Sequence, residues 1–134
     1  MKQYLDVIGK VTLTPKNNTL YFKALLNHKT MRPFNNLLSW RDNDNCEYVN
    51  IDFTKDKKIE IRIDGLFYNL GQHIGDFMQE LIDMGFDVDG YYYIHTDDGE
   101  NWAKIMGIQD NTITYKELDN ISLYSSATKQ LLMV

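Results

Sequence analysis

The sequence predicts an α+β protein with a mainly antiparallel sheet of about six strands, one long amphipathic helix and a short irregular helical segment. Several segments alternate apolar and polar residues with a period of two, which is typical of strands with one face buried. One segment repeats apolar residues with the period of a helix. Short turn motifs join successive strands, and this favours antiparallel pairing.

A single domain is predicted over residues 1–134. Of the 134 residues, 43% are hydrophobic and 13% aromatic, so the chain can bury a core without disulfides or a structural metal. No internal repeat, low-complexity tract or linker divides it.

The first strand is predicted from Tyr4 to Thr14, where alternate residues are apolar and Ile8 is the exception. Pro15 and the Asn17-Asn18 pair follow it, and both favour a turn. The strand should therefore bury one face and end at Pro15.

An irregular helical segment is predicted from Leu20 to Trp40, with Pro33 ending one helix and beginning another. The run RDNDN that follows is read as a polar loop. Two alternating stretches, 47–53 and 59–63, are joined by TKDK and predict an antiparallel hairpin with an aliphatic inner face. Its outer face is expected to carry Lys58, Glu60, Arg62 and Asp64.

The long helix is predicted from Leu70 to Met84, and Gly85 suits a left-handed residue at its end. Three acidic residues, Asp76, Glu80 and Asp83, lie off the apolar stripe and are expected to face solvent. The stripe consists of Leu70, Ile74, Phe77, Met78, Leu81 and Ile82.

Three more strands are predicted between Gly90 and Glu117. A four-residue turn, DDGE, and a two-residue turn, Asp110-Asn111, would connect them. The predicted opposite pairs are Tyr92 with Ile105, Ile94 with Ala103, and Lys104 with Glu117, the last a favourable charge pair.

That register sorts the side chains onto two faces. Small Ala103 and Gly107 on one face would let the long helix approach closely, which leaves the aromatic face partly exposed. The alternative buries the aromatic residues as core. One face holds Tyr91, Tyr93, His95, Trp102, Lys104, Met106, Ile108, Ile113, Tyr115 and Glu117; the other holds Tyr92, Ile94, Ala103, Ile105, Gly107, Thr112, Thr114 and Leu118.

The C-terminal stretch ISLYSSATKQLLMV fits a docked strand, a short helix or an arm that pairs with another copy, so a homodimer is among the expected states. The N-terminus lacks the apolar run of a signal peptide, and no window approaches the ~18 apolar residues of a membrane span. The single cysteine, Cys46, suits a reducing compartment. We therefore expect a cytoplasmic protein without membrane contact.

Charge divides unevenly along the chain. Residues 1–75 hold 11 Lys+Arg and 8 Asp+Glu, a net of +3, whereas residues 76–134 hold 3 and 11, a net of −8; the two sum to −5. Duplex nucleic acid is bound mainly by Lys and Arg that neutralise phosphates. The acidic second half therefore argues against direct nucleic-acid binding.

Motifs for catalysis, metals or cofactors are not found in the sequence. The histidines His28, His73 and His95 lack metal-binding spacing, and the acidic loops fail the EF-hand pattern at its first and last positions. No GxSxG, phosphate-binding glycine loop or CxxC occurs. Adjacent Asp97 and Asp98 fit a solvated turn better than acid–base chemistry. We expect no catalytic, metal or cofactor site.

The acidic residues of the second half are the remaining candidate site. They would form one docking surface for a basic partner, with aromatic side chains as anchors. Solubility alone is the competing interpretation. The predicted partner-binding residues are Asp83, Asp87, Asp89, Asp97, Asp98, Glu100, Tyr93 and Trp102.

The elements Gly90-Tyr91, Gly99-Glu100, Trp102 and Asp110-Asn111 give the C-terminal half a GY, GE, W, DN pattern over about 30 residues. This pattern resembles a group of small uncharacterised bacterial and phage α+β proteins. In size, negative charge and lack of cofactor motifs the chain is also similar in style to phage-encoded anti-CRISPR and anti-restriction inhibitors.

The resemblance implies a non-enzymatic inhibitor, encoded by a phage or mobile element. Its acidic face would act as a DNA mimic and block the basic surface of a nucleic-acid-processing host defence enzyme. An immunity-type or housekeeping protein-binding module unrelated to nucleic acid is the alternative. A hydrolase with an unrecognised carboxylate site is the third hypothesis.

Overall fold

The computed structural model describes residues 4–43, 48–68, 70–96 and 103–118. Within these ranges the fold is α+β, as the sequence predicts, with a six-stranded sheet and three α-helices; the predicted irregular helical segment forms two of those helices, α1 and α2. In chain order the elements are β1 (Tyr4–Pro15), α1 (Asn18–Asn27), the 3₁₀ turn η1 (His28–Thr30), α2 (Phe34–Asn43), β2 (Tyr48–Phe53), β3 (Ile59–Tyr68), α3 (Leu70–Met84), β4 (Phe86–Thr96), β5 (Ala103–Gln109) and β6 (Thr112–Glu117).

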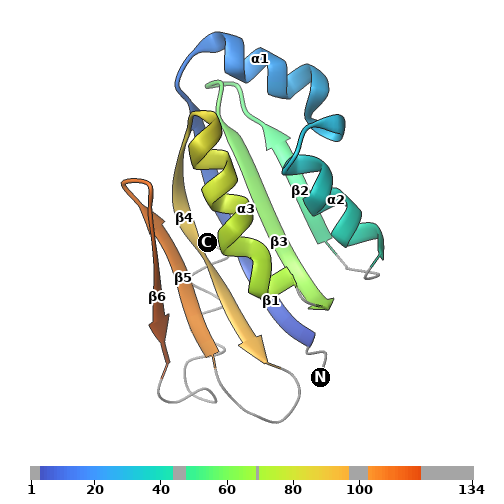
Figure 1. The fold of residues 1–134 in the computed structure, drawn as a ribbon, viewed down its shortest axis with the longest axis vertical. Helices are drawn as coiled ribbons and strands as arrows, with labels where there is room; N and C mark the ends of the chain where they lie inside the picture. Colours follow the sequence, from blue (N-terminus) through green and yellow to red (C-terminus); the bar gives the residue numbers. More distant parts are fainter. Residues whose placement is uncertain (1–3, 44–47, 69, 97–102, 119–134) are drawn as a thin grey trace.

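The six strands lie in the order β2-β3-β1-β4-β5-β6, and every neighbouring pair is antiparallel. All three helices lie over the same face of the sheet (Figure 1). The longest strands, β1 and β4, therefore form the centre of the sheet. They join the β2–β3 hairpin on one side to β5 and β6 on the other.

The main core lies between the sheet and the helices. Each helix contributes apolar side chains to it, and the alternating residues of β1 and β3 supply the opposite wall, since successive strand residues point to opposite faces. Its fully buried members include Val7, Val11, Leu13, Phe34, Leu37, Ile59, Ile61, Ile63, Ile74, Met78 and Leu81.

Several elements match the predicted bounds, but β3 continues to Tyr68, past the predicted end at residue 63, and β4 begins at Phe86 rather than at Gly90. The long helix has the predicted bounds, and Gly85 follows it with φ +109°, as expected for a left-handed helix stop. The helical region is split at a cis Arg32-Pro33 bond. One loop prediction is wrong: α2 continues through Asn43, so the first residues of RDNDN are helical, and Asp44 and Asn45 lie outside the described residues.

The predicted pairing between β4 and β5 is wrong by one residue. Ile94 lies opposite Lys104, and Tyr92 lies opposite Met106. The residues from Tyr91 to Ile94 are all apolar or aromatic, so hydrophobic alternation does not fix their register. The pairing of β5 with β6 is as predicted, including Lys104 opposite Glu117.

The corrected register reverses which face of β5 meets the helices. Met106 and Ile108 join the main core with Tyr92, whereas Gly107 lies on the other face of the sheet. The predicted close approach of α3 over Ala103 and Gly107 is therefore wrong. Aromatic residues of β4 contribute to both faces, because Tyr92 and Tyr93 are each fully buried.

Two glycines allow β1 and β4 to approach closely. Gly9 lies opposite Tyr92 with φ +149°, and Gly90 lies opposite Val11 with φ +137°. A Cβ on Gly9 would overlap the carbonyl oxygen of Tyr91, and one on Gly90 would overlap that of Lys10. Backbone atoms block both positions, so neither strand can relieve the overlap by a side-chain rotation.

We expect Gly90→Ala to lower the free energy of unfolding by about 2 to 4 kcal/mol, because the new Cβ meets backbone and the φ is unfavourable for alanine. Gly107→Ala is the matched control: its Cβ would meet only the Thr114 hydroxyl at 3.7 Å, so its effect should stay within about 1 kcal/mol. Urea unfolding followed by circular dichroism measures both. Equal losses of unfolding free energy in the two variants would contradict this account of the β1–β4 contact.

Tyr92 connects β4 to β3 through the core. Its hydroxyl donates a 2.8 Å hydrogen bond to the Ile61 carbonyl, and the side chain is fully buried. Burial raises the pKa of Tyr92 above its ordinary value near 10. The neutral hydroxyl is therefore favoured in the folded state.

Because the pKa of Tyr92 is raised on folding, its contribution to stability is complete below about pH 10 and declines as pH rises further. We expect Tyr92→Phe to cost about 1 kcal/mol at neutral pH through the lost hydrogen bond. Above about pH 10 the variant should lose stability less steeply, by about 1.4 kcal/mol per pH unit. Unfolding curves of both proteins from pH 7 to 11 test this; parallel pH profiles would contradict it.

Candidate functional site

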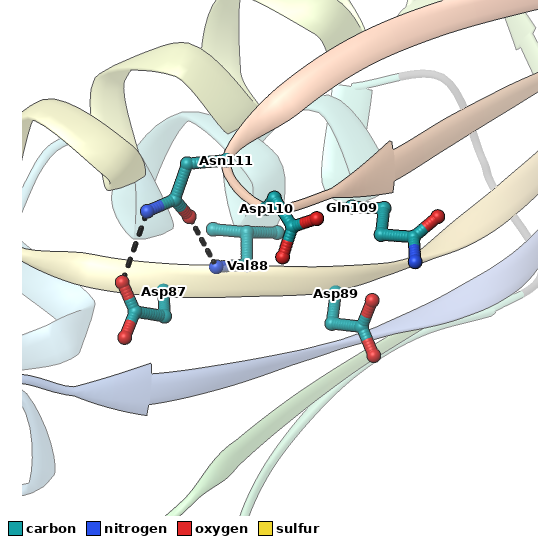
Figure 2. Close-up of a pocket in the computed structure, with 6 residues that line it drawn as sticks. All are labelled: Asp87, Val88, Asp89, Gln109, Asp110 and Asn111. Atoms are coloured by element: carbon teal, nitrogen blue, oxygen red, sulfur yellow. Dashed lines mark hydrogen bonds between the residues drawn. The ribbon is translucent and has the colours of Figure 1, made fainter.

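The candidate site is an open depression of about 470 Å³ at the start of β4, beside the β5–β6 turn. Six residues from these two segments line it (Figure 2). They are Asp87, Val88 and Asp89 from β4, Gln109 from β5, and Asp110 and Asn111 from the turn.

The turn that forms one wall is a two-residue hairpin turn. Asp110 and Asn111 have φ of 52° and 58°, and Gln109 pairs with Thr112 across them. Positive φ at both central residues is the type I′ arrangement, which matches the twist of a hairpin and is tolerated by Asp and Asn. The sequence therefore determines this wall locally.

Asn111 fixes the turn to β4. Its Oδ1 accepts a hydrogen bond from the Val88 amide at 3.1 Å, and its Nδ2 donates to Asp87 Oδ1 at 3.0 Å (Figure 2). One side chain thus satisfies a backbone group of β4 and orients a carboxylate. These bonds extend the contact between β4 and the hairpin past the last paired residues, Gly90 and Ile108.

Three exposed carboxylates surround the depression. Asp87 and Asp89 project from the same side of β4, about 6.6 Å apart along the strand, and Asp110 lies between them in the view of Figure 2. Among the described residues, no ion pair joins any of the three to a lysine or arginine. Their charges are therefore left to act on solvent or on a binding partner.

A second hollow of about 250 Å³ adjoins this depression and shares Asp89 and Gln109 with it. It lies over Gly107, with Tyr91 and Thr114 on its sides. Tyr91 is 43% exposed and sits opposite Gly107, whose lack of a side chain leaves the ring uncovered. An exposed aromatic ring thus lies beside the carboxylates.

The predicted acidic surface is divided in the structure. Asp87 and Asp89 line the depression, and Asp83 is exposed near the end of α3, where it accepts a 3.1 Å hydrogen bond from Gln79. Glu80 instead pairs with Arg32 at 3.1 Å. Four other predicted residues, Asp97, Asp98, Glu100 and Trp102, lie outside the described residues.

Tyr93 cannot be the exposed anchor that the sequence predicts, because it is fully buried. It packs with Ile8 and Ala103 in a small cluster on the sheet face away from the helices. Tyr93 lies opposite Ile8 on β1. Ile8, the apolar residue that breaks the alternation of β1, therefore packs on Tyr93.

Sequence reasoning missed Asp110, Gln109, Asn111 and Tyr91 as site residues. The sequence predicts Asp110 and Asn111 only as a turn, and the structure confirms that turn. The missing information was the start of β4, which begins at Phe86 rather than at Gly90, so that its pairing with β5 brings Asp87 and Asp89 beside this turn. Residues 23 positions apart in sequence, Val88 and Asn111, meet only through that pairing.

Tyr115, on β6, is a second tyrosine with a shifted pKa. Partial burial, with the negative charge of Asp76 nearby, raises its pKa. The Lys104 ammonium lies 4.8 Å from the centre of the Tyr115 ring. This cluster is on the helix-facing side of β5 and β6, away from the acidic depression, and we assign it a structural role.

Metal binding is not supported by the arrangement of side chains: the described ranges contain no group of three or more His, Cys, Asp or Glu placed to hold one ion. Within these ranges no helix is both long enough and apolar enough to cross a membrane.

Comparisons of the chain with protein-family models, with curated proteins and with solved structures each gave no match.

We expect Asn111→Gly and Asn111→Ala to separate the two roles of this residue. Both remove the bonds to Val88 and Asp87, but only alanine also strains the left-handed backbone. Asn111→Gly should cost about 1 kcal/mol and Asn111→Ala about 1 kcal/mol more. Denaturant unfolding gives these values, and hydrogen exchange at the Val88 amide should accelerate in both variants. An unchanged exchange rate would show that Asn111 does not hold the turn to β4.

Proposed function

We propose that the protein is a non-enzymatic protein-binding inhibitor that presents Asp87, Asp89 and Asp110 to a basic surface on its partner. The observation that carries this proposal is the set of three exposed carboxylates around one depression without an ion pair among the described residues. Unpaired surface charges of one sign steer an oppositely charged partner and select against others.

Tyr91 extends the proposed surface. Exposed tyrosines often supply anchors at interfaces because they bury apolar area and offer a hydroxyl with little loss of conformational entropy. Tyr91 projects from the same side of β4 as Asp89, and the two share a hollow. In the proposal Tyr91 is the anchor in place of Tyr93, because Tyr93 is fully buried.

The finer part of the proposal concerns the partner. A net charge of −8 over residues 76–134 suits a target whose Lys and Arg normally bind phosphates, such as a nucleic-acid-processing enzyme of host defence. Carboxylates would occupy the positions of phosphates, and a phage or mobile element would encode the inhibitor. This is supported by charge and by the sequence resemblance alone.

A second candidate function is an immunity-type or housekeeping module whose partner is not related to nucleic acid. The exposed apolar residues of α1 favour it: Phe22, Leu25 and Leu26 are 46%, 38% and 78% exposed. Residues at positions i, i+3 and i+4 share one helix face and can serve as anchors in a partner's groove. The two candidates differ in which surface binds and in their dependence on salt.

Capture of partners from bacterial lysate tests the proposal. The variant Asp87→Asn/Asp89→Asn/Asp110→Asn should lose a basic partner that the wild type retains at low salt, and the wild type should lose it as salt rises towards physiological levels. The variant Asp52→Asn/Asp56→Asn/Asp64→Asn changes net charge equally at other sites and should retain the partner. Capture that survives the first variant but fails after Leu26→Ala would favour the second candidate instead.

A competition experiment tests whether the protein blocks the partner's nucleic-acid-binding surface. The captured partner should lose its binding to labelled nucleic acid when wild-type protein is added in stoichiometric amount, and the triple Asn variant should not displace the nucleic acid. A partner that binds the protein and nucleic acid together would rule out the blocking role.

A further inference from the structure

Among the strands that the structure describes, β6 forms an open edge of the sheet. It is the last strand in the sheet order, and Ile113 alone among its six residues is not exposed. Figure 1 shows it outside the region that the helices cover. An exposed edge strand presents unpaired backbone groups that can accept another strand.

The hairpin geometry identifies which backbone groups point outward. A two-residue turn is closed by a hydrogen-bonded pair, here Gln109 with Thr112, and hydrogen-bonded and non-bonded pairs then alternate along the ladder. Thr114 and Lys116 therefore bond to β5. The amide and carbonyl groups of Ile113, Tyr115 and Glu117 point away from β5, toward the open side.

We propose that β6 pairs with β6 of a second copy of this chain, antiparallel about a two-fold axis at Thr114. In this register Thr114 lies opposite its own copy, Ile113 lies opposite Tyr115 twice, and Thr112 lies opposite Lys116. Both Ile113–Tyr115 pairs exchange backbone hydrogen bonds through their outward groups. The two sheets become one continuous sheet with a closed, isologous interface.

The strand's own side chains favour a second copy over an unrelated strand. The pairing places a β-branched residue against an aromatic ring on the helix side and threonine against threonine on the other, both favourable cross-strand combinations. Each Lys116 faces a threonine, so no like charges lie directly opposite. The carboxylates of the acidic depression are not among the paired residues 112–116, so this inference does not rest on the proposed function.

Proline at an outward-pointing position is a selective test. Tyr115→Pro removes an amide that does not bond to β5, so the hairpin should remain while the dimer is lost. Tyr115→Val keeps the amide and a strand-forming side chain as the matched control. In sedimentation velocity we expect concentration-dependent dimers for the wild type and Tyr115→Val, and a dissociation constant raised roughly tenfold or more for Tyr115→Pro.

Crosslinking tests the register in a Cys46→Ser background, since Cys46 is the only native cysteine. Thr114→Cys should form a disulfide between copies on mild oxidation, because a non-bonded antiparallel pair places its Cα atoms about 4.5 Å apart. Tyr115→Cys lies opposite Ile113 and should not crosslink.

Three results would overturn the inference. These are a wild type that stays monomeric at the highest soluble concentration, a Tyr115→Pro variant that still dimerises while folded, and crosslinking through position 115 but not 114. Circular dichroism of each variant shows whether it is folded.

Discussion

The close backbone contact between β1 and β4 holds the two halves of the sheet together. Gly9 and Gly90 each face the backbone of the opposite strand, so side chains are excluded at two points in the centre of the sheet. This contact joins the β2–β3 hairpin and the β5–β6 hairpin into one sheet that the helices cover on a single face. It also fixes the position of Asp87 and Asp89, which lie on β4 just before Gly90.

The acidic depression is a consequence of how β4 and β5 diverge. Their pairing ends at Gly90 and Ile108, and beyond that point Asn111 bridges the strands with its side chain. Asp87 and Asp89 then have solvent rather than β5 on that side, while β1 pairs with them on the other. A turn that is favoured locally by Asp and Asn thereby becomes one wall of a surface built from distant parts of the chain.

The two sides of the sheet differ in what they offer a partner. The helix side is occupied by the main core, whereas the other side combines a small buried cluster around Tyr93 with the exposed ring of Tyr91 and the carboxylates. Pairing through β6 would place the corresponding faces of the two copies on the same side of the joined sheet. One assembly would then carry two acidic depressions. Such bivalency strengthens binding when both sites can be occupied at once.

Local sequence signals are sufficient to place α3 and the Asp110-Asn111 turn, because periodicity, turn residues and the glycine after α3 act over a few neighbouring residues. The β4–β5 register is set only by pairing between distant segments, since the β4 residues from Tyr91 to Ile94 are apolar on both faces and a shift by one residue leaves no local signature. That register places Tyr91 opposite Gly107, and the start of β4 at Phe86 places Asp87 and Asp89 beside the Asp110-Asn111 turn. Gln109, Asp110, Asn111 and Tyr91 therefore join the candidate site only through pairing between distant segments.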